Sequence, residues 1–196
     1  MYRKYVKRLI DIILSLIGLP IFLVIFLIVA PIIMIEDKGP IFYNAPRLGR
    51  NAKIFMMYKF RSMKVNSPDL RNKDGTTYNS EEDSRVTKIG KVLRKTSIDE
   101  VPQILNILKG EMSLIGPRPD LPDSMKTIYR PGDEIKLTVR PGITGFSQAY
   151  YRNSSTLDER FDGDDYYAKH VSFILDLKIF FKTVQTVFGH KNVYRN

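Results

Sequence analysis

Cysteine is absent from this sequence of 196 residues, and acidic residues are scarce relative to basic ones. The absence of cysteine excludes disulfides, thiolate metal sites and cysteine nucleophiles, so any chemistry must rely on carboxylates, basic groups and hydroxyls. The 21 Asp and Glu oppose 31 Lys and Arg, which gives a formal charge of +10. This charge indicates an anionic partner, but it does not distinguish nucleic acid from lipid headgroups or phosphorylated substrates.

The amino terminus is basic and then strongly apolar. Arg3, Lys4, Lys7 and Arg8 precede an apolar run from Leu9 to Ile35. As a straight helix this run would be roughly 40 Å long, which exceeds the ~30 Å hydrocarbon core of a bilayer. A secretory signal is the alternative, but signals have apolar stretches of about 7 to 15 residues and a small-residue cleavage site that this run lacks. The run therefore predicts a membrane segment attached to one globular domain.

Pro20 lies near the middle of this run, where a proline removes a backbone hydrogen bond and kinks or breaks a helix. Two short arms could enter one leaflet and return to the same face. Basic residues flank both ends of the run, since Lys38, Arg47, Arg50 and Lys53 follow it. A single kinked transmembrane helix and a re-entrant hairpin both remain compatible with this pattern.

Beyond Gly39 the sequence is that of a globular domain. Residues 41–43 and 54–60 predict a small hairpin. Ser67 to Arg85 is a polar stretch that predicts a long surface loop, either filler or an active-site flap. Val86 to Lys95 predicts a helix with one basic face, which would lie in solvent or on a membrane surface. Phe173 to Phe188 predicts an amphipathic helix that packs on the core or lies at the membrane interface.

Two acidic residues occupy the predicted start of another helix. Ser97 and Glu100 have capping-box spacing, Pro102 suits a first turn, and Gly110 ends the apolar pattern. Asp99 and Glu100 would then lie at the positive end of a helix dipole, which favours ionised carboxylates and attracts phosphate. The same pair is also a common capping pattern with no function beyond stability.

Several basic and glycine-rich segments could serve a phosphorylated ligand. Gly116 to Pro119 is a rigid turn that presents Arg118, and Lys59, Arg61 and Arg94 lie upstream. Arg140 to Gln148 is punctuated by glycines, which allow a backbone to approach a phosphate closely. Each of these segments alone is equally typical of an ordinary turn.

Together the segments resemble the bacterial sugar transferase family, the monotopic polyprenyl-phosphate phosphoglycosyl transferases. The resemblance covers nearly the whole chain in order and spacing. It rests on the basic start with its proline-broken apolar run and on four further stretches: Tyr58 to Met63, Ser97 to Asn106, Lys109 to Pro119 and Arg140 to Gly145.

The resemblance implies an enzyme that transfers a sugar 1-phosphate from a UDP-sugar to polyprenyl (undecaprenyl) phosphate and releases UMP. Asp99 would be the nucleophile that forms a covalent aspartyl-phosphosugar and would also contact Mg²⁺, and Glu100 would assist proton transfer or metal positioning. The remaining matched residues would bind substrates. Arg118 would neutralise the donor phosphates, Lys59 and Arg94 would bind the polyprenyl phosphate headgroup, and Arg140, Gly142, Gly145 and Gln148 would lie on the nucleotide side.

The same resemblance implies an α+β, helix-rich fold in its small, single-function form. Residues 1–38 would be a re-entrant helix-break-helix anchor with Pro20 at the break, and residues 39–196 a catalytic domain on the cytoplasmic face of the bacterial inner membrane, with amphipathic interfacial helices. Leu19 departs from the family, because many members have Ser before this proline.

Two other classes of function are compatible with composition. A non-catalytic membrane scaffold of a glycan assembly complex would explain the anchor, and a membrane-tethered nucleic-acid binder would explain the charge. No recognisable nucleic-acid motif is present, so we expect no nucleic-acid partner. The sequence leaves open the sugar, the glycoconjugate pathway and whether the protein forms a homo-oligomer.

Overall fold

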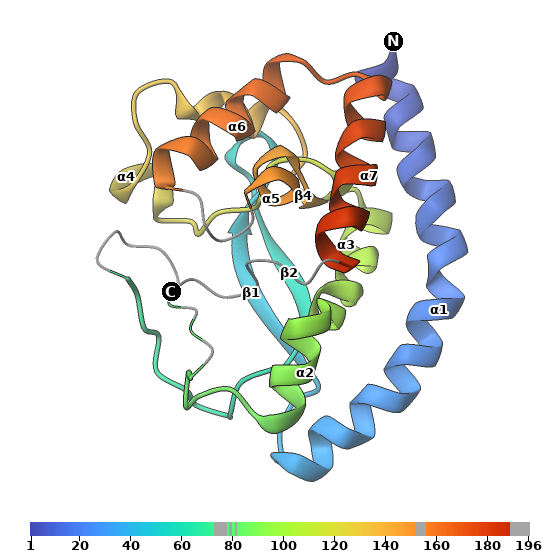
Figure 1. Cartoon of the computed structure of the whole chain (residues 1–196), viewed down its shortest axis with the longest axis vertical. Helices are drawn as coiled ribbons and strands as arrows, with labels where there is room; N and C mark the ends of the chain where they lie inside the picture. Colours follow the sequence, from blue (N-terminus) through green and yellow to red (C-terminus); the bar gives the residue numbers. More distant parts are fainter. Residues whose placement is uncertain (73–77, 79, 81, 152–155, 189–196) are drawn as a thin grey trace.

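The computed structural model describes residues 1–72, 78, 80, 82–151 and 156–188. Helices dominate, and two small two-stranded sheets accompany them, as the predicted fold class requires (Figure 1). The main helices are α1 (Lys7–Glu36), α2 (Lys88–Thr96), α3 (Ile104–Lys109), α4 (Ser124–Thr127), α5 (Phe146–Tyr150), α6 (Leu157–Lys169) and α7 (Phe173–Phe188). The strands are β1 (Phe42–Leu48), β2 (Ile54–Phe60), β3 (Ser113–Ile115) and β4 (Gly142–Thr144).

Helix α1 is long, apolar and uninterrupted, and it curves along one side of the molecule (Figure 1). Among the described residues, only the stretch Tyr2–Glu36 is long and apolar enough to cross a membrane. The predicted helix break at Pro20 is wrong, because the backbone of α1 remains helical through this residue. The proline removes one hydrogen bond, but side chains before and after it, Ser15 and Phe22 among them, are buried against the domain and hold the two halves in line.

The apolar packing of α1 forms the main core of the molecule. Phe22, Val29 and Ile33 of α1 are buried against Phe60 of β2, and Leu93 and Ile104 complete the cluster. The opposite face of α1 is exposed and apolar, with side chains that include Ile17, Leu27 and Ile28. Fully burying a large aliphatic side chain contributes about 1.5–3 kcal/mol, so the buried face alone explains why α1 lies against the domain.

Polar contacts fix both ends of α1 to the same domain. Near the amino end, Arg8 donates to the carbonyl oxygens of Ile107 and Leu108 at 2.6 and 3.0 Å, and Lys7 forms a 2.7 Å ion pair with Asp176 of α7. At the carboxyl end, the Glu36 carboxylate accepts hydrogen bonds from the first backbone N–H groups of α2. The next residue, Asp37, forms an ion pair with Arg61.

The predicted hairpin is confirmed and is longer than expected. Strands β1 and β2 are antiparallel, with Tyr43 opposite Lys59 and Arg47 opposite Phe55. The second sheet is a parallel pair, β3 with β4. Its glycines are tightly packed, because a side chain on Gly142 or Gly145 would collide with the backbone of Gly116. The described part of the predicted loop from Ser67 to Arg85 contains no helix or named strand.

The segment from α2 to α3 differs from prediction at one point. A 3-10 helix, η3 (Ile98–Gln103), carries the two acids and leads into α3, which ends at Gly110 as predicted. The predicted capping box is wrong. Ser97 has a left-handed backbone with φ of 60° and caps the end of α2, and its side chain makes no cap hydrogen bond to η3. The tight turn between α2 and η3 therefore replaces the capping geometry.

Candidate functional site

A cavity of about 1200 Å³ lies between the hairpin, η3 and the carboxyl-terminal helices. Its lining includes Gly18, Ile21 and Ile25 of α1 as well as polar side chains such as Gln148 and Thr186. This volume exceeds the roughly 300–1,000 Å³ of ordinary ligand pockets. The cavity is therefore large enough for two substrates, and its wall offers both apolar and polar side chains.

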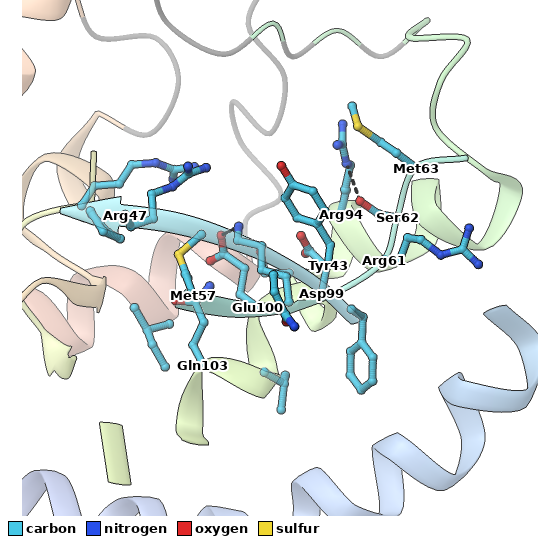
Figure 2. A pocket seen from close by; sticks show the side chains of 18 of the residues that line it. Tyr43, Arg47, Met57, Arg61, Ser62, Met63, Arg94, Asp99, Glu100 and Gln103 are labelled. Atoms are coloured by element: carbon cyan, nitrogen blue, oxygen red, sulfur yellow. Dashed lines mark hydrogen bonds and ion pairs between the residues drawn. The ribbon is translucent and has the colours of Figure 1, made fainter. Parts of the chain in front are cut away.

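Asp99 and Glu100 lie in the wall of this cavity, below the hairpin (Figure 2). They differ in their contacts. Glu100 accepts a hydrogen bond from Lys59 Nζ at 2.5 Å within an ion pair. Asp99 is 8% exposed, and within the described residues no hydrogen bond or ion pair to its carboxylate is found. One acid is thus held by a cation, and the other is a buried carboxylate without such a partner.

The environment of Asp99 disfavours its charge. Burial raises the pKa of Asp99 to about 6, and the neighbouring Glu100 adds to this, while Lys59, Arg94 and Arg118 oppose the shift. A bound cation or electrophile would therefore stabilise this buried carboxylate more than it would stabilise an exposed one. The two acids therefore differ in their surroundings, since Glu100 is ion-paired with Lys59 and the Asp99 carboxylate has no such contact among the described residues.

The two cations predicted to bind the acceptor come from different elements and have different partners. Lys59, on β2, is the partner of Glu100, and Arg94, on α2, donates from Nε to Ser62 Oγ at 3.0 Å. Figure 2 shows Arg94 and Ser62 on one side of Asp99 and Glu100 and Arg47 on the other. Both Lys59 and Arg94 line the cavity, so the structure brings them together with the acids.

Arg118 is exposed and lines the cavity at the turn after β3. A buried ionic network supports this turn from behind. Lys136, 1% exposed in its side chain, bonds Asp120 at 2.8 Å and Asp164 at 2.6 Å. Burial opposes the charge on Asp120, but Lys136 and Arg160 outweigh it and hold the pKa of this carboxyl below its usual value. The network joins the Arg118 turn to α6, and Asp164 continues it by accepting from Ser147 beside Gln148.

The predicted nucleotide-side residues are only partly brought together. Gly142 and Gln148 line the cavity, whereas Arg140 and Gly145 are not among its lining residues. Arg140 donates to the Gly110 carbonyl at 2.9 Å. Gly142 and Gly145 allow close backbone packing on Gly116. Gly142 and Gln148 therefore form part of the cavity wall, and Gln148 is the member of the set that offers a side chain to it.

The site offers few protein ligands for a metal. Within the part of the chain that is described, no cluster of three or more carboxylate or imidazole groups could hold an ion. Mg²⁺ is usually held by one or two carboxylates together with substrate phosphates and water, so such a cluster is not required. The buried, unpartnered carboxylate of Asp99 beside Glu100 fits that donor set.

Sequence reasoning did not single out several residues that build the site. Tyr43 and Arg47 of β1 point toward the cavity, and Gln103 of η3 lies below Glu100 (Figure 2). The register of the hairpin could have identified the two β1 residues, because they share a face with Lys59. Asn106 is fully buried and binds the backbone of β2, donating to Met56 O and accepting from Tyr58 N. The sequence could have identified Asn106, because it is a polar residue within an apolar helical pattern.

The loop from Ser67 to Arg85 contributes to the cavity wall through several of its described residues, including Asp69, Arg71 and Tyr78. Its end is anchored by a buried ion pair between Arg85 and Asp83 at 2.6 Å. Arg85 also donates to the Pro68 carbonyl at 2.8 Å, which closes the base of the loop. The described residues of this loop therefore contribute to the cavity wall.

Comparison with known proteins gives one consistent result. A model of the family described as bacterial sugar transferase matches residues 2–190. The chain is 39% identical over 188 residues to the UDP-N-acetylgalactosamine-undecaprenyl-phosphate N-acetylgalactosaminephosphotransferase of Aeromonas hydrophila, covering 93% of this chain and 44% of that protein. It is 38% identical over 192 residues to the exopolysaccharide production protein ExoY of Sinorhizobium fredii, covering 92% of this chain and 84% of that one.

A third relative is the UDP-glucose:undecaprenyl-phosphate glucose-1-phosphate transferase of Klebsiella pneumoniae. It is 39% identical over 196 residues, which cover 96% of this chain and 41% of the relative. The chain thus spans less than half of two of these relatives and most of the third.

Proposed function

Since the chain belongs to the bacterial sugar transferase family, and is therefore a transferase, we propose that it moves a sugar 1-phosphate from a UDP-sugar to undecaprenyl phosphate. The products would be undecaprenyl-diphosphate-sugar and UMP, and the reaction would be the first membrane step of glycoconjugate synthesis. The observation that carries this proposal is a buried carboxylate, Asp99, in the wall of a cavity that is lined by several cations.

The proposed reaction has two displacements at one phosphorus atom. An Asp99 oxygen forms a bond to the sugar-linked phosphorus, and the bond from that phosphorus to the bridging oxygen breaks. The electron pair stays on that oxygen, which leaves as part of UMP. An oxygen of undecaprenyl phosphate then attacks the same phosphorus and frees the Asp99 carboxylate. The absence of an ion pair at Asp99 within the described residues, against the Lys59 contact of Glu100, supports Asp99 as nucleophile and Glu100 as helper.

Asp99, with Glu100 beside it, would hold Mg²⁺, which when bound neutralises the charge of the donor diphosphate. Lys59 and Arg94 would bind the phosphate of the lipid acceptor, and Arg118 that of the donor. The apolar lining at α1 supports an acceptor whose prenyl chain lies near Ile21 and Ile25, and the polar side chain of Gln148 in the wall supports a nucleotide there.

We further propose that α1, which continues through Pro20, has both of its ends on the cytoplasmic face of the inner membrane. The contacts of Lys7 and Arg8 at one end and of Glu36 and Asp37 at the other join both ends to one domain, which supports this placement. An interfacial position for α7 is supported by its exposed apolar side chains, which are Phe173, Ile174, Leu177, Phe180, Phe181 and Val184.

The test is release of UMP from a panel of UDP-sugars with Mg²⁺ and undecaprenyl phosphate. We expect one or a few donors to give UMP and a lipid-linked sugar. Asp99→Asn should abolish turnover, and the matched control Asp123→Asn, an exposed aspartate outside the cavity, should retain it. Absence of UMP with every donor, or full activity in Asp99→Asn, would instead favour a non-catalytic scaffold.

A further inference from the structure

One face of the hairpin carries a row of side chains into the cavity. Residues that are paired across antiparallel strands share a face, so Tyr43 with Lys59, Ala45 with Met57 and Arg47 with Phe55 lie on the same side. Tyr43, Arg47, Met57 and Lys59 all line the cavity. Four residues along a strand correspond to about 13 Å, so Arg47 starts from a backbone position well removed from the Lys59 end of the row.

Arg47 is a half-buried cation with few internal contacts. Its Nη1 donates to the Pro46 carbonyl at 3.0 Å, and within the described residues no carboxylate lies in salt-bridge distance of it. A guanidinium presents several further donors in a planar fork. Burial, followed by the like charge of Arg118, holds the pKa of Arg47 below its usual value. A second arginine beside the first adds repulsion that a bound anion would relieve.

The carboxylate of Asp120, which acts on Arg47, cannot supply that anion. Asp120 attracts Arg47, but its carboxylate is already bonded to Lys136 and Tyr129 and approached by Arg160. The two arginines therefore face the cavity with charge that the described protein groups do not neutralise. Planar forks of this kind bind phosphate with two parallel hydrogen bonds.

The position of Arg47 indicates which of the two substrates it would contact. In Figure 2, Arg47 lies on the opposite side of the acid pair from Arg94, which is the proposed acceptor cation. Arg118, the proposed donor cation, acts on Arg47 and helps to lower the pKa of its guanidinium. Arg47 thus belongs to the side of the cavity where the donor diphosphate would lie.

We propose that Arg47 and Arg118 together bind the phosphate of the departing nucleoside monophosphate. This inference rests on the proposed function and assigns a leaving-group site within it. When the bond between the sugar-linked phosphorus and the bridging oxygen breaks, negative charge develops on that oxygen. Two guanidinium groups at this point stabilise that charge through charge-assisted hydrogen bonds.

The experiment compares Arg47→Gln with Arg50→Gln, a neighbouring exposed arginine outside the cavity, in full-length protein with Mg²⁺. Three constants are measured: the KM for the UDP-sugar, the inhibition constant for UMP and the KM for undecaprenyl phosphate. Loss of a charge-assisted phosphate contact should raise the first two by about 10- to 100-fold in Arg47→Gln. The KM for undecaprenyl phosphate should stay within about twofold, and Arg50→Gln should match wild type in all three.

Arg47→Lys provides a second variant that keeps the charge but loses the fork. We expect it to weaken UMP inhibition by a smaller factor than Arg47→Gln does. UMP inhibition equal to wild type in the folded variants, or a rise in the KM for undecaprenyl phosphate alone, would overturn the assignment. A wild-type protein that releases no UMP would overturn the proposed function and this inference with it, so the wild-type control separates the two failures.

Discussion

Asp165 of α6 is a single carboxyl group placed where its charge is unfavourable. Its Oδ1 is buried and has no hydrogen-bond partner among the described residues. Burial, together with the neighbouring charges of Asp133 and Asp164, raises the pKa of Asp165 to about 6. Because this value lies above the ordinary value of about 3.9, the folded protein binds this proton more tightly than the unfolded chain does.

The resulting stability is present at low pH and is lost as the pH rises through about 6. Asp165→Asn removes the charge, so we expect a higher Tm than wild type at pH about 7.5 and little difference at about 4.5. Thermal unfolding in detergent at the two pH values measures this, with Asp123→Asn as the matched exposed control. An equal Tm for Asp165→Asn and wild type at the higher pH would contradict the account.

Individual site residues could be predicted only where they belong to a recognisable sequence motif. Asp99, Glu100, Lys59 and Arg94 were identified in the sequence, and all four line the cavity. The burial of Asp99 and the ion pair of Glu100 depend on β2 crossing η3, a contact between segments about forty residues apart that no local pattern encodes. Arg47 was missed because its position in the cavity wall follows from the register of the hairpin, which is set by the turn and the buried face.

At the level of elements, α2 begins with help from a distant residue. Thr87 caps the helix by accepting from Gly90 N, and Glu36, at the end of α1, accepts from Lys88 N and Ile89 N at 2.6 and 2.9 Å. A carboxylate at this position satisfies backbone donors that the helix leaves free and complements its dipole. The end of the membrane segment is thus joined to the helix that carries Arg94.

Glu36→Ala should lower the free energy of unfolding by about 1 kcal/mol, the usual cost of losing such a cap. Urea unfolding followed by circular dichroism measures the loss, and Glu82→Ala, another exposed glutamate, is the control. We expect Glu36→Gln to retain part of the stability, since its amide oxygen can still accept one hydrogen bond. Equal midpoints for Glu36→Ala and Glu82→Ala would show that the cap contributes nothing.

The elements that the sequence predicted best are those with strong local signals. The hairpin, α2 and α7 were predicted from periodicity, and Gly110 was predicted as a stop, which its φ of 86° explains. The predicted capping box was wrong because Ser97 adopts a left-handed backbone conformation that ends α2. The predicted break at Pro20 was wrong because packing on both sides of the proline outweighs one lost hydrogen bond. In both cases tertiary packing overrode a local rule.

For the whole molecule, the contacts at both ends of α1 have a topological consequence. If these contacts persist in the membrane, Lys4 and Lys38 must lie on the same side as the catalytic domain. Because the chain contains no cysteine, Lys4→Cys, Lys38→Cys and Lys126→Cys each carry a single thiol. All three positions are exposed, and Lys126 marks the side of the domain.

We expect a membrane-impermeant maleimide to label all three thiols in inverted vesicles and none of them in intact cells. Since both ends bond to one domain, a transmembrane α1 would have to break one set of contacts. Labelling of Lys4→Cys and Lys38→Cys from opposite sides would show that α1 spans the bilayer and would rule out a placement with both ends on one face.

The central claim is that Asp99 carries the sugar phosphate between the two substrates, and mass spectrometry of the intact protein tests it most directly. The protein is mixed with its UDP-sugar and Mg²⁺ without acceptor, quenched and weighed. We predict a mass increase of one sugar phosphate, mapped to Asp99, that disappears when undecaprenyl phosphate is added and never forms in Asp99→Asn. UMP release that requires both substrates and leaves no adduct, or an adduct on another residue, would contradict the claim.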